Sequence, residues 1–250
     1  MQQTLLAFNV SHQLLTTAEE VLWAGASAGA IGVLNSANFV QDMLAPSTRL
    51  RIVPESGFFI PSKAVAYFEW VRGIRVPYQD LAVRYFDVTF GSYIDPYCAA
   101  AQKALDRPEV MCLTASVLYT HIRPPVFYAN NIFDSVILSI LGWSKGAPAE
   151  RAYLSEFGEA MVHDLTAAPA KDAILMPSCV GHCENLCPAS TNRVNGYSYR
   201  DVLADWYFGT NRLPHRLVDD CFSVFREPCS KTCKGICVIP GGPGNGSLSD

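Results

Sequence analysis

A serine stands between two glycines where the chain changes from an apolar run to a helical pattern. Residues 25–29 read GASAG, the G-x-S-x-G spacing of a nucleophile elbow, in which a sharp strand-to-helix turn exposes a serine hydroxyl. We expect both glycines to be required, because strand and helix nearly touch there and the serine adopts a strained backbone conformation. Ser27 is therefore a candidate nucleophile. The pentapeptide alone fits an ordinary Gly/Ala-rich turn of an α/β protein equally well.

A serine hydroxyl attacks an ester at neutral pH only with help from a histidine base, whose ring is oriented by a carboxylate. Asp134 and His182 follow Ser27 in the chain order Ser, acid, His, and each comes just after a predicted strand. We predict that these three residues form a catalytic triad. The alternatives are that Asp134 is a helix N-cap or a solvated residue, and that His182 is a loop histidine or a zinc ligand.

The tetrahedral intermediate of such a reaction needs backbone N–H donors for its oxyanion. One donor comes from the residue after the nucleophile, which here is Ala28. A second donor comes from a loop after an earlier strand. We predict the Ala28 amide as one oxyanion-binding group.

The chain contains nine cysteines, which is many for a reducing cytosol. Cys98 and Cys112 stand together in mid-chain, and the other seven fall between residues 179 and 237. We predict disulfides and name Cys98 with Cys112 as one pair, since the other seven allow too many connectivities. A zinc cluster around residues 179–187 is the alternative. Because nine is odd, one thiol is free or its partner is missing. We expect no metal and no cofactor.

The elements that must position these groups alternate along the chain. Short apolar runs predict strands, and 3.6-residue periodicity predicts helices. The predicted strands are 21–24, 50–53, 126–129 and 173–176; the predicted helices are 2–17, from the 25–29 turn to 43, 62–72, 147–167 and 198–209. An aromatic-rich segment, 75–106, is expected to form helices and loops over the sheet. The fold class is therefore α/β, with a parallel sheet.

The amino-acid composition and net charge argue against some classes of function. Half of the 250 residues are apolar, which suits one sizeable core. The net charge of −4, with no dense cluster of Lys or Arg, argues against nucleic acid as a partner. No apolar run reaches the length of a membrane span. We expect a monomer acting on an ester substrate.

Several sequence blocks resemble the pectin acetylesterase and Notum family of carboxylesterases. The blocks are VLWAGASAG at 21–29, ESGFF at 55–59, PVFYANNIFD at 125–134, PSCVGHC at 177–183 and DWYFG at 205–209. The resemblance covers nearly the whole chain and implies an α/β-hydrolase-like fold, with Ser27 as nucleophile, Asp134 as acid and His182 as base. One departure is Ala30, where the family pattern has a glycine.

Members of this family deacetylate pectin, or remove a palmitoleoyl group from secreted Wnt proteins. The resemblance implies a polysaccharide deacetylase working through an acyl-enzyme, with a Notum-like protein carboxylesterase as the alternative. A third possibility is a non-catalytic remnant that keeps the fold without a complete site.

The first 20 residues do not have the pattern of a signal peptide, and only 26 residues precede Ser27, whereas the family carries several strands and an oxyanion loop upstream. We therefore expect a fragment of a longer secreted or cell-wall esterase. We divide it into a partial catalytic domain, 1–227, and a Cys/Pro/Gly-rich tail, 228–250, whose last ten residues are expected to be disordered.

Overall fold

The computed structural model describes residues 17–58, 62–73, 93–143, 149–183 and 192–233. Its centre is a parallel sheet of five strands in the order β1-β2-β3-β5-β9. These are β1 (Glu20–Ala26), β2 (Arg49–Glu55), β3 (Phe127–Ala129), β5 (Ala173–Met176) and β9 (Arg216–Val218). Because parallel neighbours need long crossover connections, helices run between the strands. The predicted α/β class is confirmed.

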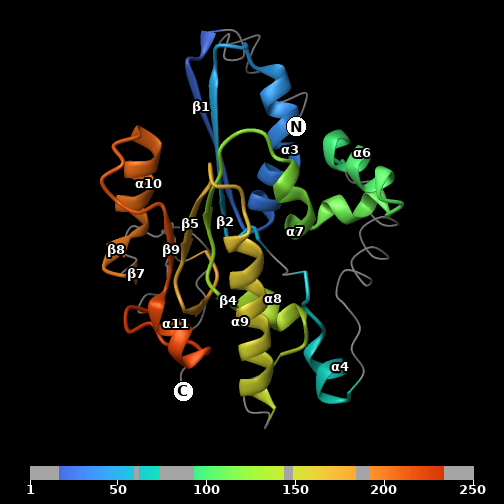
Figure 1. The fold of residues 1–250 in the computed structure, drawn as a ribbon, viewed down its shortest axis with the longest axis vertical. Coiled ribbons are helices and arrows are strands. Elements are labelled where there is room, and N and C mark those ends of the chain that lie inside the picture. The colour runs from blue at the N-terminus through green and yellow to red at the C-terminus, as the bar shows by residue number, and fades with distance from the viewer. Residues whose placement is uncertain (1–16, 59–61, 74–92, 144–148, 184–191, 234–250) are drawn as a thin grey trace, which may run out of the picture.

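The helices flank the sheet on both faces (Figure 1). They are α3 (Ala28–Met43), α4 (Tyr67–Val71), α6 (Pro96–Ala104), α7 (Ala115–Leu118), α8 (Ser135–Ile140), α9 (Glu150–Thr166), α10 (Tyr199–Phe208) and α11 (Asp220–Phe225), with 3-10 turns at Glu109–Leu113 and Tyr119–His121. Two short strand pairs complete the fold: β4 (Phe133–Asp134) with β6 (Val180–Gly181), and β7 (Arg193–Val194) with β8 (Tyr197–Ser198).

Alternation along the strands divides the core into two clusters, because successive strand residues point to opposite faces. The larger cluster contains Ile52 and Ile174, which pack against residues of α3 and α9. The smaller cluster takes their neighbours Val53 and Leu175 and packs them under α10, where Trp206 lies. The central strands are therefore apolar on both faces, which explains why the sequence shows them as continuous apolar runs.

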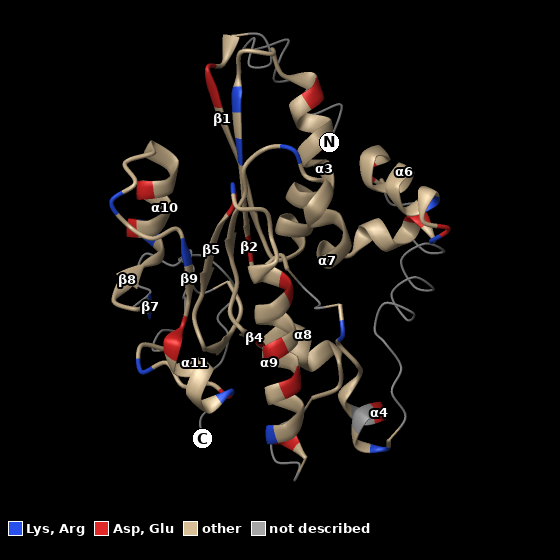
Figure 2. Cartoon of the chain, in the orientation of Figure 1, with Lys and Arg blue, Asp and Glu red and all other residues tan. Residues whose placement is uncertain are grey.

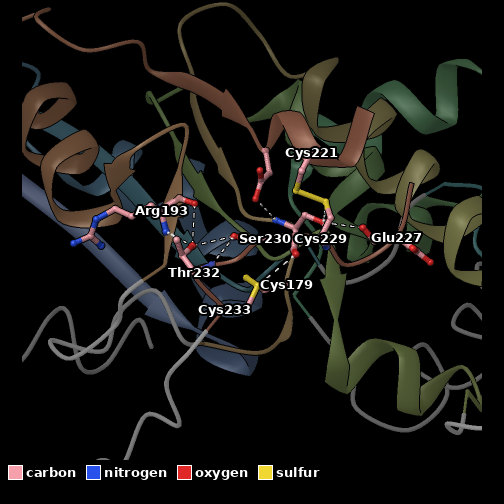
Figure 3. The surroundings of a disulfide bond; sticks show 10 residues. Cys179, Arg193, Cys221, Glu227, Cys229, Ser230, Thr232 and Cys233 are labelled. Carbon is pink, nitrogen blue, oxygen red and sulfur yellow. Dashed lines mark hydrogen bonds between the residues drawn. A yellow bond between two sulfur atoms is a disulfide. The ribbon is translucent and has the colours of Figure 1, made fainter. Parts of the chain in front are cut away.

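Three disulfides join described residues. Cys98–Cys112 links α6 to the 3-10 turn that follows it. Cys179–Cys233 and Cys221–Cys229 tie the C-terminal part of the described chain to the sheet and to α11 (Figure 3). Cys183 is a free thiol, and Cys187 and Cys237 lie outside the described residues. The zinc alternative loses one of its ligands, because the Cys179 sulfur is already in a covalent bond.

The predicted helix over 62–72 is shorter than expected and begins at Tyr67. Ser62 explains part of the difference: its backbone N–H and its hydroxyl both donate to the Asp164 carboxylate on α9. This contact holds the segment before α4 against another helix in a non-helical conformation. The predicted helix over 2–17 and the predicted disorder at the C-terminus fall almost entirely on residues outside the described ranges, as does much of segment 75–106.

Within the described ranges, no helix is both long enough and apolar enough to cross a bilayer. Lys and Arg residues are scattered over the ends of several elements in Figure 2, rather than gathered along one edge. The division at residue 228 stays a prediction, although Cys229 and Cys233 tie the start of the predicted tail to the folded part.

Candidate active site

Ser27 forms the junction between β1 and α3, which end and begin on either side of it. Its backbone has φ 55° and ψ −126°, a combination that L residues rarely adopt. The Ser27 N–H donates to the Glu55 carbonyl, 3.0 Å away at the end of β2, which holds the turn to the neighbouring strand. The hydroxyl is thereby presented at the carboxyl edge of the sheet, where sites of open α/β sheets form.

Crowding at this turn is distributed differently from what the G-x-S-x-G pattern led us to expect. A Cβ on Gly25 would lie 2.6 Å from the Gly29 carbonyl oxygen, so a side chain is excluded there. A Cβ on Gly29 meets nothing within 4 Å, so the expectation of crowding at that glycine is wrong. The second close approach is instead at Gly57, where a Cβ would lie 2.5 Å from the Ala30 Cβ.

The structure brings Ser27, His182 and Asp134 together. His182 Nε2 lies 2.7 Å from Ser27 Oγ, and its Nδ1 lies 2.8 Å and 3.0 Å from the two Asp134 oxygens. Each distance is within hydrogen-bond range. The Asp134 side chain is 1% exposed and the His182 side chain 14% exposed, so the pair is largely shielded from water while Ser27 is half-buried.

Asp134 has two structural duties. Its Oδ1 accepts the backbone N–H groups of Val136 and Ile137, each at 3.1 Å, so it is the N-cap of α8. The same carboxylate contacts the His182 ring. The alternative role of Asp134 as a helix cap therefore coexists with its contact to the histidine, and capping fixes the direction in which the carboxylate points.

A two-residue strand pair brings His182 to this carboxylate. β4 and β6 run parallel with Asp134 paired to Gly181, the residue before His182. The Asp134 and His182 side chains therefore lie close together because of the register of the two strands. Their separation in the sequence is closed by the parallel crossover through α8 and α9.

The surroundings of His182 raise the pKa of its ring. Burial lowers the pKa of His182, but its hydrogen bonds to Asp134 and Cys183 raise it, and the net result is a pKa well above the ordinary value of 6.5. The ionised Asp134 favours the imidazolium, as a general base in an acyl-transfer site requires once it has accepted a proton.

Ala28 is exposed and is the first residue of α3. The first amides of a helix have no intrahelical acceptor, and the helix dipole is positive at that end. The Ala28 N–H therefore directly follows Ser27 in the chain and stands in the first turn of α3, where amides have no intrahelical acceptor.

The other described histidines lie away from this group. His163 contacts Asp164 from an exposed position on α9, His121 ends a 3-10 turn, and His215 pairs with Asp205. Within the described ranges, His, Cys, Asp and Glu side chains form no group of three or more that could hold a metal ion. The Cys98–Cys112 disulfide is buried in the larger core cluster.

Sequence reasoning assigned no role to Glu55, and it missed Ser56 and Asn130. Glu55 is fully buried, and its carbonyl holds Ser27. Ser56 Oγ accepts the N–H of Cys183 at 2.9 Å, and Asn130 Oδ1 accepts the N–H of Phe58 at 3.2 Å. The sequence signals were the ESGFF block at 55–59, which contains Ser56, and the PVFYANNIFD block at 125–134, which contains Asn130.

Comparisons with known proteins show which family this chain is similar to. The family model described as Pectinacetylesterase matches residues 7–234. Human palmitoleoyl-protein carboxylesterase NOTUM is 27% identical over 179 residues, covering 67% of this chain and 34% of NOTUM. The zebrafish (Danio rerio) notum1a protein is 26% identical over 176 residues, with the same coverage. The chain thus spans about a third of the length of these curated relatives.

Solved structures support the fold. Two crystal forms of the Wnt deacylase Notum from Drosophila superpose with TM-scores of 0.69 and 0.73 at 20% sequence identity. The matches cover 93% and 94% of this chain and 65% of each Notum chain. The α/β-hydrolase-like arrangement predicted from the sequence is therefore confirmed as a fold.

Proposed function

Because the chain belongs to the pectinacetylesterase family, we propose that it takes part in carboxylic-ester hydrolysis with Ser27 as nucleophile, His182 as general base and Asp134 as the group that orients it. The observation that carries this proposal is the continuous path from Ser27 Oγ to His182 Nε2 at 2.7 Å and from His182 Nδ1 to Asp134 at 2.8 Å.

In the first half-reaction, Ser27 Oγ attacks the ester carbonyl and its proton passes to His182 Nε2. The tetrahedral intermediate collapses when the carbonyl–alkoxy bond breaks and the imidazolium returns that proton to the departing alcohol. In the second half-reaction, water attacks the acyl carbon while Nε2 takes the water's proton. The bond between the acyl carbon and Ser27 Oγ then breaks, the carboxylic acid leaves, and the imidazolium returns the proton to Ser27 Oγ. Asp134 remains ionised throughout and stabilises the imidazolium.

The Ala28 amide supplies one hydrogen bond to the oxyanion in both intermediates. Its position at the start of α3 supports this role, since the unsatisfied first-turn amides and the helix dipole favour negative charge. Loss of one oxyanion donor costs on the order of 10²–10³ in rate, so the measured rate depends on whether a second donor is present.

For the substrate, we propose an acetylated polysaccharide such as pectin, in keeping with the family description. The second candidate is an acylated protein. It is supported by the names of the relatives, which are palmitoleoyl-protein carboxylesterases. An acetyl group needs little space beside Ser27, whereas a long acyl chain needs a deep apolar pocket.

We further propose that the protein is a monomer that acts outside the cell or in the cell wall. Three disulfides among the described residues support an oxidising location.

The function is tested by hydrolysis of p-nitrophenyl acetate and p-nitrophenyl octanoate, with wild type and Ser27→Ala compared at equal concentration. We expect wild-type turnover and a Ser27→Ala rate at the level of buffer. A faster rate with acetate supports the polysaccharide reading, and a faster rate with octanoate supports the acylated-protein reading. Equal rates for wild type and Ser27→Ala on both esters would instead identify the protein as a non-catalytic remnant.

A further inference from the structure

The last residue of β2 and the residues that follow it contact all three segments that carry the proposed triad. We call residues 55–58 the β2 loop. Toward the nucleophile, the Glu55 carbonyl accepts the Ser27 N–H at 3.0 Å. Toward the segment that precedes Asp134, the Ser56 N–H donates to the Ala129 carbonyl at 2.7 Å. The first two residues of this loop therefore bind two of the three segments by their backbones.

The third segment is held by a side chain. Ser56 Oγ accepts the backbone N–H of Cys183 at 2.9 Å, across 127 positions of sequence. Ser56 is fully buried and Cys183 is partly exposed, so this hydrogen bond is partly buried. Ser56 has φ 50° and Cys183 has φ 58°. Two left-handed residues are thus joined by one bond, and neither would adopt this conformation without surrounding contacts that impose it.

The bond lies next to His182 in the chain, on the side opposite the β4–β6 strand pair. On its N-terminal side, His182 is preceded by Gly181, the last residue paired with β4. On its C-terminal side, the next residue is Cys183, whose N–H is held by Ser56. The histidine is therefore fixed between a strand pair and one serine hydroxyl.

We propose that Ser56 is a positioning residue, whose hydroxyl holds the backbone after His182 so that the imidazole stays within hydrogen-bond reach of both Ser27 and Asp134. This role deepens the proposed function and rests on it. Ser56 touches neither the attacking atom nor the proton in transit; it acts through the position of the ring.

Replacing Ser56 with alanine removes the acceptor and leaves the rest of the β2 loop unchanged. A displacement of about 1 Å in a catalytic group costs on the order of 10²-fold in rate, so we expect Ser56→Ala to lower kcat by about 10- to 100-fold. KM for p-nitrophenyl acetate should stay the same, because the Ser56 side chain is fully buried and not open to a substrate. Ser56→Gly, which removes the hydroxyl and suits the positive φ, should lose as much kcat.

The matched control is Ser178→Ala. Ser178 is also fully buried, and its hydroxyl also accepts a cysteine N–H, that of Cys229 at 3.2 Å. The Ser178 hydroxyl donates to the Glu227 carbonyl, in the C-terminal part of the described chain. Its removal should lower Tm about as much as Ser56→Ala does, while kcat changes by less than about threefold.

A second measurement reports the pKa of the His182 ring directly. The His182 imidazole is titrated by NMR in Ser27→Ala and in Ser27→Ala with Ser56→Ala, neither of which needs to turn over substrate. We expect the second variant to titrate closer to 6.5, since a displaced ring loses its hydrogen bond to Asp134. Unchanged titration together with unchanged kcat would overturn the proposal. So would Ser56→Gly with wild-type kcat, because backbone strain rather than the hydroxyl would then explain the loss.

The two proposals fail in different ways. If Ser27→Ala hydrolyses ester as fast as wild type, the proposed function fails. The NMR titration still decides whether Ser56 positions the His182 ring.

Discussion

Among the described residues, two histidine–aspartate pairs join a mostly buried ring to a buried carboxylate, whereas the ring of a third pair, His163 with Asp164, is exposed. In one, His182 Nδ1 lies 2.8 Å from Asp134; in the other, His215 Nε2 lies 2.6 Å from Asp205. Both carboxylates are buried, at 1% and 6% side-chain exposure. Both also accept backbone N–H groups, so each pair is part of a hydrogen-bonded turn or helix start.

The pairs differ in where the sheet places them. His215 directly precedes β9, at the amino end of a strand, and its carbonyl accepts the N–H of Ile174. Asp205 lies on α10, so this pair ties a helix to the sheet. His182 lies at the carboxyl edge, with its second nitrogen on the Ser27 hydroxyl. A histidine–carboxylate contact is therefore a candidate for catalysis only when the other ring nitrogen, the one not bonded to the carboxylate, contacts a nucleophile.

Removing each histidine in turn tests whether the two pairs differ in function. His182→Ala should lower kcat/KM for p-nitrophenyl acetate by about 10⁴-fold or more, because the nucleophile loses its base. His215→Ala should leave kcat/KM within about threefold of wild type and lower Tm. Steady-state kinetics and thermal unfolding on both variants check this. A similar loss of activity in both would mean that the two pairs are not functionally distinct.

Replacing the two aspartates, Asp134 and Asp205, tests the same difference between the pairs. Asp134→Asn should reduce kcat by about 10³- to 10⁴-fold, since an amide allows the wrong ring tautomer. It should keep most of the helix start, because asparagine is also a good N-cap. Asp205→Asn should leave kcat nearly unchanged. Its measured effect should be a lower Tm, since Asp205 accepts from Thr210, His215 and the backbone of Arg212.

The smallest expected effect is on the pH profile. The pKa of His182 is raised, so its neutral, basic form is populated only as pH rises above the ordinary 6.5. We expect kcat/KM, corrected for spontaneous hydrolysis, to increase with pH through a midpoint above 6.5. Cys183→Ala removes one of the groups that raise this pKa and should move the midpoint down. An unmoved midpoint would show that Cys183 does not influence the ring.

Much of the fold could be predicted because its signals are local. The strand at 173–176 has the predicted bounds, and α10 ends before Gly209, which adopts the left-handed conformation of a helix C-cap. The order of Ser27, Asp134 and His182 along predicted strands was sufficient to select the residues that the structure brings together.

The parts that could not be predicted depend on tertiary contacts. Nothing near Ser56 in the sequence indicates that its hydroxyl meets the backbone of Cys183. Gly57 is crowded by Ala30 from another element, and Gly29 is not crowded although its motif suggests that it is. The pairing of Cys179 with Cys233 rather than with a nearer cysteine likewise follows from the folded arrangement.

Asp134 both begins α8 and touches His182. Because Asp134 has both a structural and a proposed catalytic role, the three triad residues would be lost at different rates in a lineage no longer selected for catalysis. Ser27 and His182 could then drift freely, whereas replacing Asp134 by a residue that cannot cap would still weaken a helix. Among distant relatives, an aspartate at this position is therefore weaker evidence of retained chemistry than a serine at the elbow.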